Sequence, residues 1–547
     1  MPSDTSPAER SARQAGTNGA RATAPLGRLR AGALGAVTTL ALVIPVAGCG
    51  ATPPVPDVPT GPPAASPGIA SPAASSTGPS APAIVGPTPA PTRAPSGWPY
   101  SSNLGEPTFG SDGTMYVLDR NAESSDRQII TALDSAGHVR NGWPIEAAAG
   151  SEFGPLVAGP DASLYVEERR RVTDGNVLHR LDASGRDSTG WPFDIPPSLA
   201  CPTGNTCYPA LLSVASDGTA YVRTQGGPRV QALAVDGAGA VKPGWPIELP
   251  ELEWSGDQLG PDGTVFLVGR PAGTPTFDPT RGVVDEGAEL WAFGSDGRPR
   301  PGWPMSVPNI RGFLISPQGD IVISGLIDDV GELCNNPRRT VFTVVAPDGR
   351  TRPGWPRGST GLASLPVVGA DGTVYYMSAT KKVYAHDQAG VVRPGWPVEV
   401  PGGGDGCGPE RPHLAPDGTL FAVGDVVLAM SADGTFPAGW PYRPSGETIG
   451  PCFDSECLGG HGTPAFGPDG SVYLIVFGPD AGGVRAEVVA LDRLGRLKPG
   501  WPYRLPFDAK TTPIGTPTVT PDGRVFIRAG SSPALYLALD PDGTLSD

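Results

Sequence analysis

The sequence predicts an all-β protein, organised as a single β-propeller of nine repeated units. Three marks recur along the chain: the tripeptide Gly-Trp-Pro, a turn related to Pro-Asp-Gly-Thr that precedes alternating β-forming residues, and an apolar run that ends in a turn related to Asp-x-x-Gly. Each mark occurs nine times, and successive tripeptides lie 41 to 61 residues apart. Self-similarity at this period is typical of an array of supersecondary units.

Nine of the eleven tryptophans belong to the tripeptide. One large ring per unit at a constant offset indicates that each indole packs between neighbouring sheets. A ligand platform made of aromatic rings is the alternative interpretation. The repeated residues are Trp98, Trp143, Trp191, Trp245, Trp303, Trp355, Trp396, Trp440 and Trp501.

The shortest unit, residues 354–395 with the segment that follows, shows how one sheet is built. Alternating and apolar runs predict strands over residues 362–369, 372–379, 381–387 and 390–400, which together make one four-stranded antiparallel sheet. In the turns, Asp caps the backbone with its side chain and Gly supplies the positive φ of a tight hairpin. Each turn offers one carboxylate, whereas a calcium loop needs several in alternation, so we expect no metal site.

Small four-stranded sheets at this period, arranged radially, form a β-propeller. Residues 371–375 (Asp-Gly-Thr-Val-Tyr) and 490–495 (Ala-Leu-Asp-x-x-Gly) resemble the repeat of the pyrroloquinoline-quinone-type propeller family, and the resemblance covers residues 97–547. The tryptophan spacing departs from that family's usual pattern. The repeat count predicts nine blades, and eight, the familiar number in the resembled family, is the alternative.

The two ends of the repeat region complement each other. The last unit stops without its own outer strand, while Trp98 precedes any inner strand. We therefore expect the N-terminal strand to pair with the last blade and close the ring, which removes the open edge of a linear stack.

The resemblance does not extend to a cofactor. Quinoprotein dehydrogenases of that family hold their cofactor against a pair of adjacent cysteines beside calcium, and this chain has no adjacent cysteines. We expect neither a cofactor nor a metal.

Residues 1–48 have the parts of a secretory signal: a basic region, an apolar run and small residues before Cys49. Residues 46–49 (Val-Ala-Gly-Cys) resemble the bacterial lipobox, which implies that Cys49 is the lipid attachment site. A plain signal peptide or a membrane-spanning anchor is the alternative. Residues 49–96 are almost wholly Pro, Ala, Ser, Thr and Gly, which predicts a disordered tether before the propeller at 97–547.

The six other cysteines are an even number in an exported chain, which predicts disulfides. Two pairs are close in sequence, and the connectivity is one of fifteen. Zinc is the alternative, although no Cys-x-x-Cys pair exists. The candidates are Cys201, Cys207, Cys334, Cys407, Cys452 and Cys457.

In a four-stranded blade the two tight turns share one face and the other two connections share the opposite face. All the variation in length falls on that second face, with insertions at residues 270–288 and 326–339 and a charged run at residues 167–171. Functional residues are expected on long loops over a rigid scaffold. This long-loop face is therefore the candidate binding surface.

The histidines give the only hint of chemistry. We expect His138, His179 and His386 at the surface. Convergence of His413 and Glu410 with His461 and Asp454 at the mouth of the channel would form an acid/base or metal cluster. A polar rim without chemistry is the alternative, and no Gly-x-Ser-x-Gly, His-Glu-x-x-His or phosphate-loop motif is present.

The net charge of −15 argues against nucleic acid or an anionic membrane surface as the main partner. We expect a monomer, lipid-anchored on the outer side of a bacterial cytoplasmic membrane, that acts as a non-catalytic protein-binding scaffold through its long-loop face. The alternative is a secreted glycan hydrolase or lyase, or a sugar-binding module, that uses the same face.

Overall fold

The architecture is taken from a computed structural model of the chain. The structure describes residues 97–102, 107–120, 127–170, 176–195, 208–225, 230–250, 252–271, 287–307, 309–327, 339–359, 361–401, 411–445, 448–449, 452–453, 456–457, 462–480, 483–530 and 533–546. The predicted signal segment, Cys49 and the predicted tether lie outside these residues.

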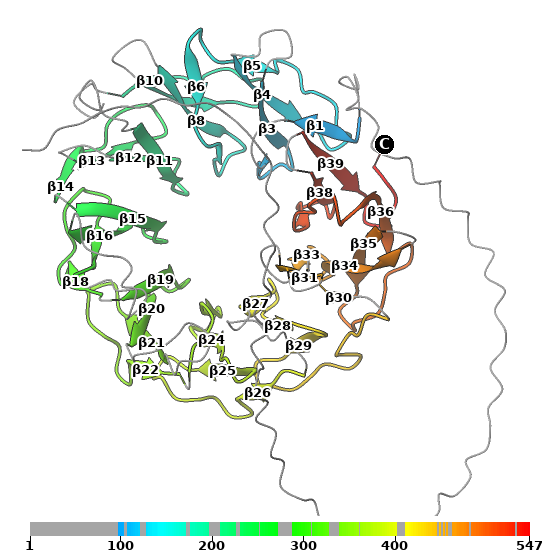
Figure 1. The fold of residues 1–547 in the computed structure, drawn as a ribbon. Coiled ribbons are helices and arrows are strands. Elements are labelled where there is room, and N and C mark those ends of the chain that lie inside the picture. Colours follow the sequence, from blue (N-terminus) through cyan, green and yellow to red (C-terminus); the bar gives the residue numbers. More distant parts are fainter. Residues whose placement is uncertain are drawn as a thin grey trace, which may run out of the picture. The chain divides into compact units, whose positions relative to one another are not determined.

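Nine antiparallel sheets follow one another around a ring (Figure 1). Blades 1 to 3 contain, in chain order, β2 (Thr108–Phe109), β3 (Met115–Arg120), β4 (Gln128–Leu133) and β5 (Ile145–Glu146); β6 (Ser151–Phe153), β7 (Val157–Ala158), β8 (Leu164–Arg170), β9 (Val177–Leu181) and β10 (Phe193–Asp194); β11 (Tyr208–Val214), β12 (Ala220–Gln225), β13 (Val230–Val235) and β14 (Ile247–Leu249).

Blades 4 to 6 repeat the same arrangement of four strands. They contain β15 (Leu252–Leu259), β16 (Val265–Pro271), β17 (Glu289–Phe293) and β18 (Met305–Ser306); β19 (Ile310–Ile315), β20 (Ile321–Ile327), β21 (Arg339–Val345) and β22 (Arg357–Gly358); β23 (Val367–Val368), β24 (Val374–Met377), β25 (Lys382–His386) and β26 (Val398–Glu399).

Blades 7 to 9 complete the ring. Blade 7 has β27 (His413–Leu414), β28 (Leu420–Val423) and β29 (Val427–Met430), with a Val427–Tyr442 bridge in place of a regular outer strand. The remaining strands are β30 (Thr448–Ile449), β33 (Ala465–Phe466), β34 (Val472–Asp480), β35 (Gly483–Leu491) and β36 (Tyr503–Asp508) of blade 8, the separate ribbon β31 (Cys452–Phe453) and β32 (Glu456–Cys457), and β37 (Thr518–Val519), β38 (Val525–Ala529) and β39 (Ala534–Leu539) of blade 9.

The ring closes as the sequence predicts. The N-terminal strand β1 (Tyr100–Ser102) pairs antiparallel with β39, with Tyr100 opposite Tyr536. Blade 9 is therefore assembled from both ends of the repeat region (Figure 1). The all-β class, the nine blades and this closure are confirmed.

The two faces of the ring differ in regularity. The same five-residue spacing separates the first two strands in all nine blades, from residues 110–114 in blade 1 to residues 520–524 in blade 9. These turns and the Asp-x-x-Gly turns after the third strand define the turn face. On the opposite long-loop face, the connection between the second and third strands ranges from residues 272–288 in blade 4 to residues 481–482 in blade 8.

Each Gly-Trp-Pro tripeptide precedes the outer segment of its own blade and contacts the next blade, and all nine Trp-Pro peptide bonds are cis. The indoles are only 7–8% exposed. Each indole Nε1–H donates to a turn carbonyl of the following blade at 3.0–3.2 Å. The pairs are Trp98–Ser135, Trp143–Ala183, Trp191–Gly237, Trp245–Ser295, Trp303–Pro347, Trp355–Gln388, Trp396–Ala432, Trp440–Arg493 and Trp501–Pro541.

An aromatic ring on the second strand packs against the indole in eight blades, as Tyr116 does with Trp143 at 5.5 Å between centroids. Blade 5 has Val322 at that position. There Trp355 instead contacts His386 of blade 6, while Phe342 stacks on Tyr376 at 4.3 Å. The buried core is thus a series of clusters, each shared by two neighbouring blades.

The outer strand is shorter than the sequence predicts. In blade 6 only Val398–Glu399 forms a regular strand, and residue 392 makes a single bridge to His386. Pro394 and Pro397 lack the N–H that a sheet ladder needs, and Gly395 has a φ of +85°, which ends the extended conformation.

The junction explains why glycine precedes each tryptophan. A Cβ on Gly354, whose φ is +85°, would lie 1.9 Å from the carbonyl oxygen of Ala389 in the next blade. We predict that Gly354→Ala lowers the free energy of unfolding by at least about 2 kcal/mol, since it combines a left-handed backbone with a steric clash. Urea unfolding followed by tryptophan fluorescence measures this.

Gly358 is the matched control for that substitution. It lies four residues further in the same blade, and an added Cβ would meet nothing within 4 Å. Gly358→Ala should change stability by less than about 1 kcal/mol. Equal effects of the two substitutions would show that the blade junction does not limit stability.

Candidate functional site

The turn face carries a repeated carboxylate. In most blades the aspartate of the first turn accepts the backbone N–H two residues later, as Asp371 does from Thr373 at 3.0 Å. In six blades the residue three positions before the tryptophan is Arg or Lys and forms an ion pair with a carboxylate of that turn. The cations are Arg140, Lys242, Arg300, Arg352, Arg393 and Lys498.

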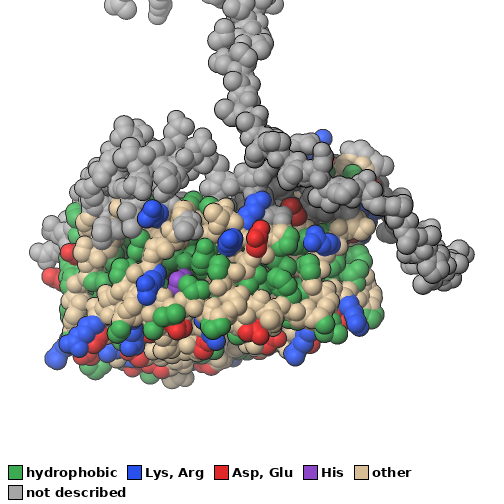
Figure 2. All heavy atoms as spheres, turned by 90° about the horizontal axis from the view of Figure 1, so that it is seen from below, with side chains coloured by type: hydrophobic (Ala, Val, Ile, Leu, Met, Phe, Trp, Pro, Cys, Tyr) green, Lys and Arg blue, Asp and Glu red, His purple; other side chains and the backbone are tan. Residues whose placement is uncertain are grey.

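These pairs hold the first turn of each of the six blades against the segment that leads to its outer strand. Burial alone would raise the pKa of Asp469, but Lys498 and Ser471 hold it down at about 2. Figure 2 shows Lys, Arg, Asp and Glu side chains gathered along the lower rim of the ring. Because these carboxylates already bind cations and backbone N–H groups, we infer that their main role on the turn face is to stabilise the turns.

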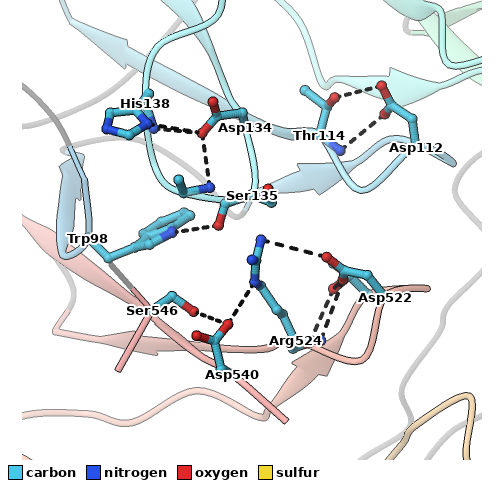
Figure 3. A network of polar contacts seen from close by, with 12 residues as sticks. Trp98, Asp112, Thr114, Asp134, Ser135, His138, Asp522, Arg524, Asp540 and Ser546 are labelled. Carbon is cyan, nitrogen blue, oxygen red and sulfur yellow. Dashed lines mark hydrogen bonds and ion pairs between the residues drawn. The ribbon is translucent and has the colours of Figure 1, made fainter. Parts of the chain in front are cut away.

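Blades 2 and 9 make the ion pair from other positions, and one of the six pairs above uses a different carboxylate. In blade 2 Arg180 of β9 reaches Asp161. In blade 5 the carboxylate that pairs with Arg352 is Asp320, which stands at the position of the turn threonine. At the closure of the ring, Arg524 of blade 9 contacts both Asp522 and Asp540 (Figure 3). The same view shows Trp98 bonded to Ser135 across the seam, beside the pair of His138 and Asp134.

Most of the long-loop face falls outside the part of the chain that the structure describes. This applies to most of the insertions at 270–288 and 326–339, to Cys201, Cys207, Cys334 and Cys407, and to Glu410, Asp454 and His461. The backbone of the β31–β32 ribbon is described, and its register sets Cys452 opposite Cys457. Directly opposed residues of an antiparallel pair have the Cα separation that a disulfide spans.

His413 lies on β27, the innermost strand of blade 7. Burial, aided by the charge of Arg411, lowers its pKa to about 4, so the ring is neutral at neutral pH. Arg411 donates to the carbonyl of Pro366 in blade 6 at 3.0 Å. Of the four residues expected to converge at the channel mouth, only His413 is described.

A buried polar group that the sequence does not predict lies in blade 2. His179 bonds Asp187 through Nδ1 at 3.1 Å and Glu168 through Nε2 at 3.4 Å. Glu168 also accepts the backbone N–H of Ala148 in the segment that enters the blade. Burial alone would lower the pKa of His179, but the two carboxylates raise it to about 9.

The expected surface position is therefore wrong for two of three histidines. The side chain of His138 is 53% exposed, whereas that of His179 is 17% exposed and His386 is buried. His386 bonds the Gly390 carbonyl through Nδ1 and the Tyr376 hydroxyl through Nε2, at 3.1 and 3.2 Å. Since a carbonyl only accepts, Nδ1 carries the proton and Nε2 accepts from the tyrosine.

Glu167 is the most deeply buried carboxylate of blade 2, with 1% of its side chain exposed. The charged run at 167–171 was expected to be a loop, but Leu164–Arg170 is the strand β8. Glu167 therefore lies inside the sheet, where Arg169 contacts it at 3.2 Å. Burial raises the pKa of Glu167 to about 7 although the guanidinium favours the ionised form.

A further buried charge lies between blades 3 and 4. Arg223 of β12 is 5% exposed, and Asp257 of β15 is near enough to act on it. Burial lowers the pKa of Arg223 and raises that of Asp257, and the opposite charge of each partner counteracts both shifts. Among the described residues, other buried charged side chains are Asp119 of blade 1 and Asp320 of blade 5.

The seam between blades 9 and 1 holds a cavity of about 350 Å³. Its walls include the rings of Phe109, Phe526 and Tyr536, the hydroxyl-bearing Thr518 and the cation Arg528. Within the described ranges, no three His, Cys, Asp or Glu side chains are grouped as metal ligands would be. No helix among the described residues has the length and hydropathy needed to cross a membrane.

A comparison of the repeats contains a sequence signal for the buried charged residues of blade 2. The residue two positions after the second-strand aromatic is apolar in blades 1, 4 and 6 to 8, but is Glu167 in blade 2 and Arg223 in blade 3. Aligning the repeats at Tyr165 would have placed Glu167 within the strand. The register of β8 with β9 sets His179 opposite Val166, so that Glu168, two residues further along β8, is its diagonal neighbour.

No family model matches the sequence, and the curated proteins likewise contain no match. Among solved structures, a eukaryotic initiation factor matches with 11% identity and a TM-score of 0.43, over 79% of this chain and 96% of that one. The Dos1 propeller matches with 11% identity and a TM-score of 0.34, over 68% and 92%. A prolyl endopeptidase matches with 15% identity and a TM-score of 0.35 over 72% of this chain, which spans about half of that protein, 48%.

The His179 group predicts a pH-dependent stability. A histidine whose folded pKa is about 9 contributes stability that is complete below pH 6.5 and is lost as the pH rises through 9. We predict that His179→Gln removes on the order of 1–3 kcal/mol of this pH-dependent stabilisation near pH 6. Urea unfolding from pH 6 to 10 measures it. The exposed His138→Gln is the control and should leave the pH profile unchanged.

Glu167 predicts a stability that changes with pH for the opposite reason, because its folded state favours the neutral form. Its folded pKa of about 7 means that the native state loses stability as the pH rises from 4.5 to 7. Glu167→Gln should therefore be more stable than the wild type at pH 8, by about 1–3 kcal/mol, and equal to it at pH 4. The surface variant Glu146→Gln is the comparison, and a Glu167→Gln protein less stable at pH 8 would contradict the burial argument.

Proposed function

We propose that this chain is a lipid-anchored, extracytoplasmic scaffold that binds another protein through its long-loop face. The observation that carries the proposal is the contrast between the faces. The first turn has one length in nine blades, whereas the opposite connections range from residues 481–482 to residues 272–288. A rigid ring with variable loops on one side is the arrangement by which scaffolds present binding surfaces.

The rigidity of the ring supports this role. Nine indole bonds join successive blades, and the two ends of the repeat region pair in β1 and β39. Loops held on such a frame lose less conformational entropy on binding than loops on a mobile one. The Val-Ala-Gly-Cys sequence at 46–49 and the Pro-rich segment at 49–96 supply the anchor and the reach in this proposal.

The anchor is tested at Cys49. Cys49→Ser should move the protein from the membrane fraction to the soluble exported fraction and abolish incorporation of a labelled fatty acid. Cys334→Ser is the matched control, because that cysteine is also expected to be exported but is not at the lipobox. Membrane retention of the Cys49→Ser protein without label would identify the apolar segment as the anchor instead.

The binding face is tested by shortening loops. We expect that replacing residues 272–286 with a short Gly-Ser connection, without loss of the folded ring, weakens crosslinking to a membrane partner at least tenfold. The same replacement of residues 481–482 is the control, since that connection is already minimal. Unchanged crosslinking after shortening both 272–286 and 328–338 would exclude the long-loop face.

The alternative function, binding or cleavage of a glycan, predicts a different experimental result. Trp254 and Trp291, the two tryptophans outside the repeat, are half-buried and lie 6.1 Å apart in blade 4. Loop-dependent binding or cleavage of purified cell-wall glycan, with no protein crosslink, would replace the protein-binding proposal with the sugar-directed one.

A further inference from the structure

The exposed apolar side chains are not scattered over the propeller. Among the described residues eight large hydrophobic side chains are exposed, and seven of them lie on the turn face. Six of the seven lie on the consecutive blades 6 to 9. We call these six the apolar arc; they are Val391, Val392, Phe436, Leu494, Leu497 and Leu545.

The repeat places members of the apolar arc at equivalent positions in successive blades. Val392, Phe436, Leu497 and Leu545 each stand two residues after the glycine of the Asp-x-x-Gly turn, in four successive blades. Blades 2, 4 and 5 have Asp187, Pro299 and Thr351 at the same position. A hydrophobic residue there is therefore not required by the blade itself.

The junctions bring neighbouring members of the arc together. The backbone of Gly439, three residues after Phe436, abuts the carbonyl of Leu494 in blade 8, where an added Cβ would be 1.8 Å away. Gly395, three residues after Val392, abuts Asp433 in blade 7 in the same way. Phe436 thus lies between the apolar residues of blades 6 and 8 and is 45% exposed.

Blade 7, at the centre of this stretch, also differs in charge. Its residue three positions before the tryptophan is Pro437, where six other blades have Arg or Lys. The exposed carboxylates Asp417 and Asp433 bond backbone N–H groups of Thr419 and Thr435, and no described cation forms an ion pair with them. The cations Arg493 and Arg496 of blade 8 belong to the same turn as Leu494, and Arg493 donates to the carbonyl of Asp469 in its own blade at 2.9 Å.

From these observations we propose that the apolar arc is a second interaction surface, which binds a segment of another protein that carries apolar side chains and at least one Lys or Arg. The apolar side chains cover Phe436 and its neighbours, and the cation takes the place of the missing one beside Asp417 and Asp433. Aromatic residues at the centre of an apolar patch are the usual energetic anchors of such interfaces.

The charge of the chain favours this occupant over two others. With a net charge of −15, a second copy of the chain and an anionic lipid surface are both repelled. A segment with Lys or Arg is attracted and complements the unpaired carboxylates of blade 7. The surface lies opposite the long-loop face, so this proposal does not depend on the function proposed above.

The test uses defined peptides and the exported full chain. We expect a fluorescent peptide of alternating Leu and Lys to bind, and the matched Leu and Glu peptide to bind at least tenfold more weakly. Phe436→Ser should weaken binding of the Lys peptide about tenfold or more. Asp417→Asn, which keeps the acceptor oxygen for Thr419, should weaken binding several-fold at low salt, with the difference reduced at high salt.

Val241→Ser is the matched control, because Val241 is at the same repeat position in blade 3, while none of the exposed large hydrophobic side chains among the described residues belongs to blades 2 or 4. It should bind the Lys peptide as the wild type does. Equal binding by Phe436→Ser, or equal affinity for the two peptides, would overturn the proposal. Sedimentation and vesicle flotation complete the test, since dimers or anionic-vesicle binding that depend on Phe436 would assign the arc to a different occupant.

Phe436→Ser and the loop replacements have separate readouts. Phe436→Ser should leave loop-dependent crosslinking to the membrane partner unchanged. Near-ultraviolet circular dichroism, which reports the buried indoles, confirms that each variant keeps its fold.

Discussion

The propeller depends on the bond between each indole N–H and a turn carbonyl of the next blade. A buried carbonyl without a donor costs about 1–3 kcal/mol, and the indole satisfies it while its ring fills the space between two sheets. Glycine on both sides of the junction allows the two backbones to approach closely, as at Gly354 and Gly390. One contact repeated nine times thus supplies hydrogen bonding, packing and spacing together.

Closure follows from the same contact. Trp98 makes for the last blade the bond that Trp143 makes for the first, and β1 supplies the outer strand that β39 requires. The seam is nevertheless chemically distinct. Arg524 takes the position of the turn threonine, and Asp540 and Ser546 from the end of the chain complete its network (Figure 3). A ring without an open edge leaves both faces available for binding.

The two faces of the ring can form binding surfaces in different ways. On the long-loop face the connection between the second and third strands differs in length from blade to blade, as loops over a rigid scaffold commonly do. The turn face is constrained by its caps and ion pairs, and it varies only by substitution at positions such as 436. A binding surface on the turn face therefore consists of side chains added to an unchanged backbone.

Individual residues show which features could be predicted from the sequence and which could not. The nine tripeptides were enough to predict the blade count and the closure, because the register of a repeat is visible in a single chain. The low exposure of His179 and the burial of His386 could not be predicted, since each depends on a partner in another strand or blade: Glu168 and Asp187 for the first, Trp355 and Tyr376 for the second. Glu167 was misplaced because a run of charges looks like a loop unless the repeats are aligned.

The sequence by itself determined the local structure: which residues turn, which alternate, and where each indole and glycine must lie, because these properties depend on neighbours along the chain. Only the tertiary structure decided which side chains meet across blades. It brought the buried Glu168 and the partly exposed Asp187 to His179, and it set Phe436 between apolar residues of two blades, where no described cation forms an ion pair with Asp417. Such contacts join residues of different strands or blades. The pKa values and the exposure of these residues depend on burial, which exists only in the closed ring.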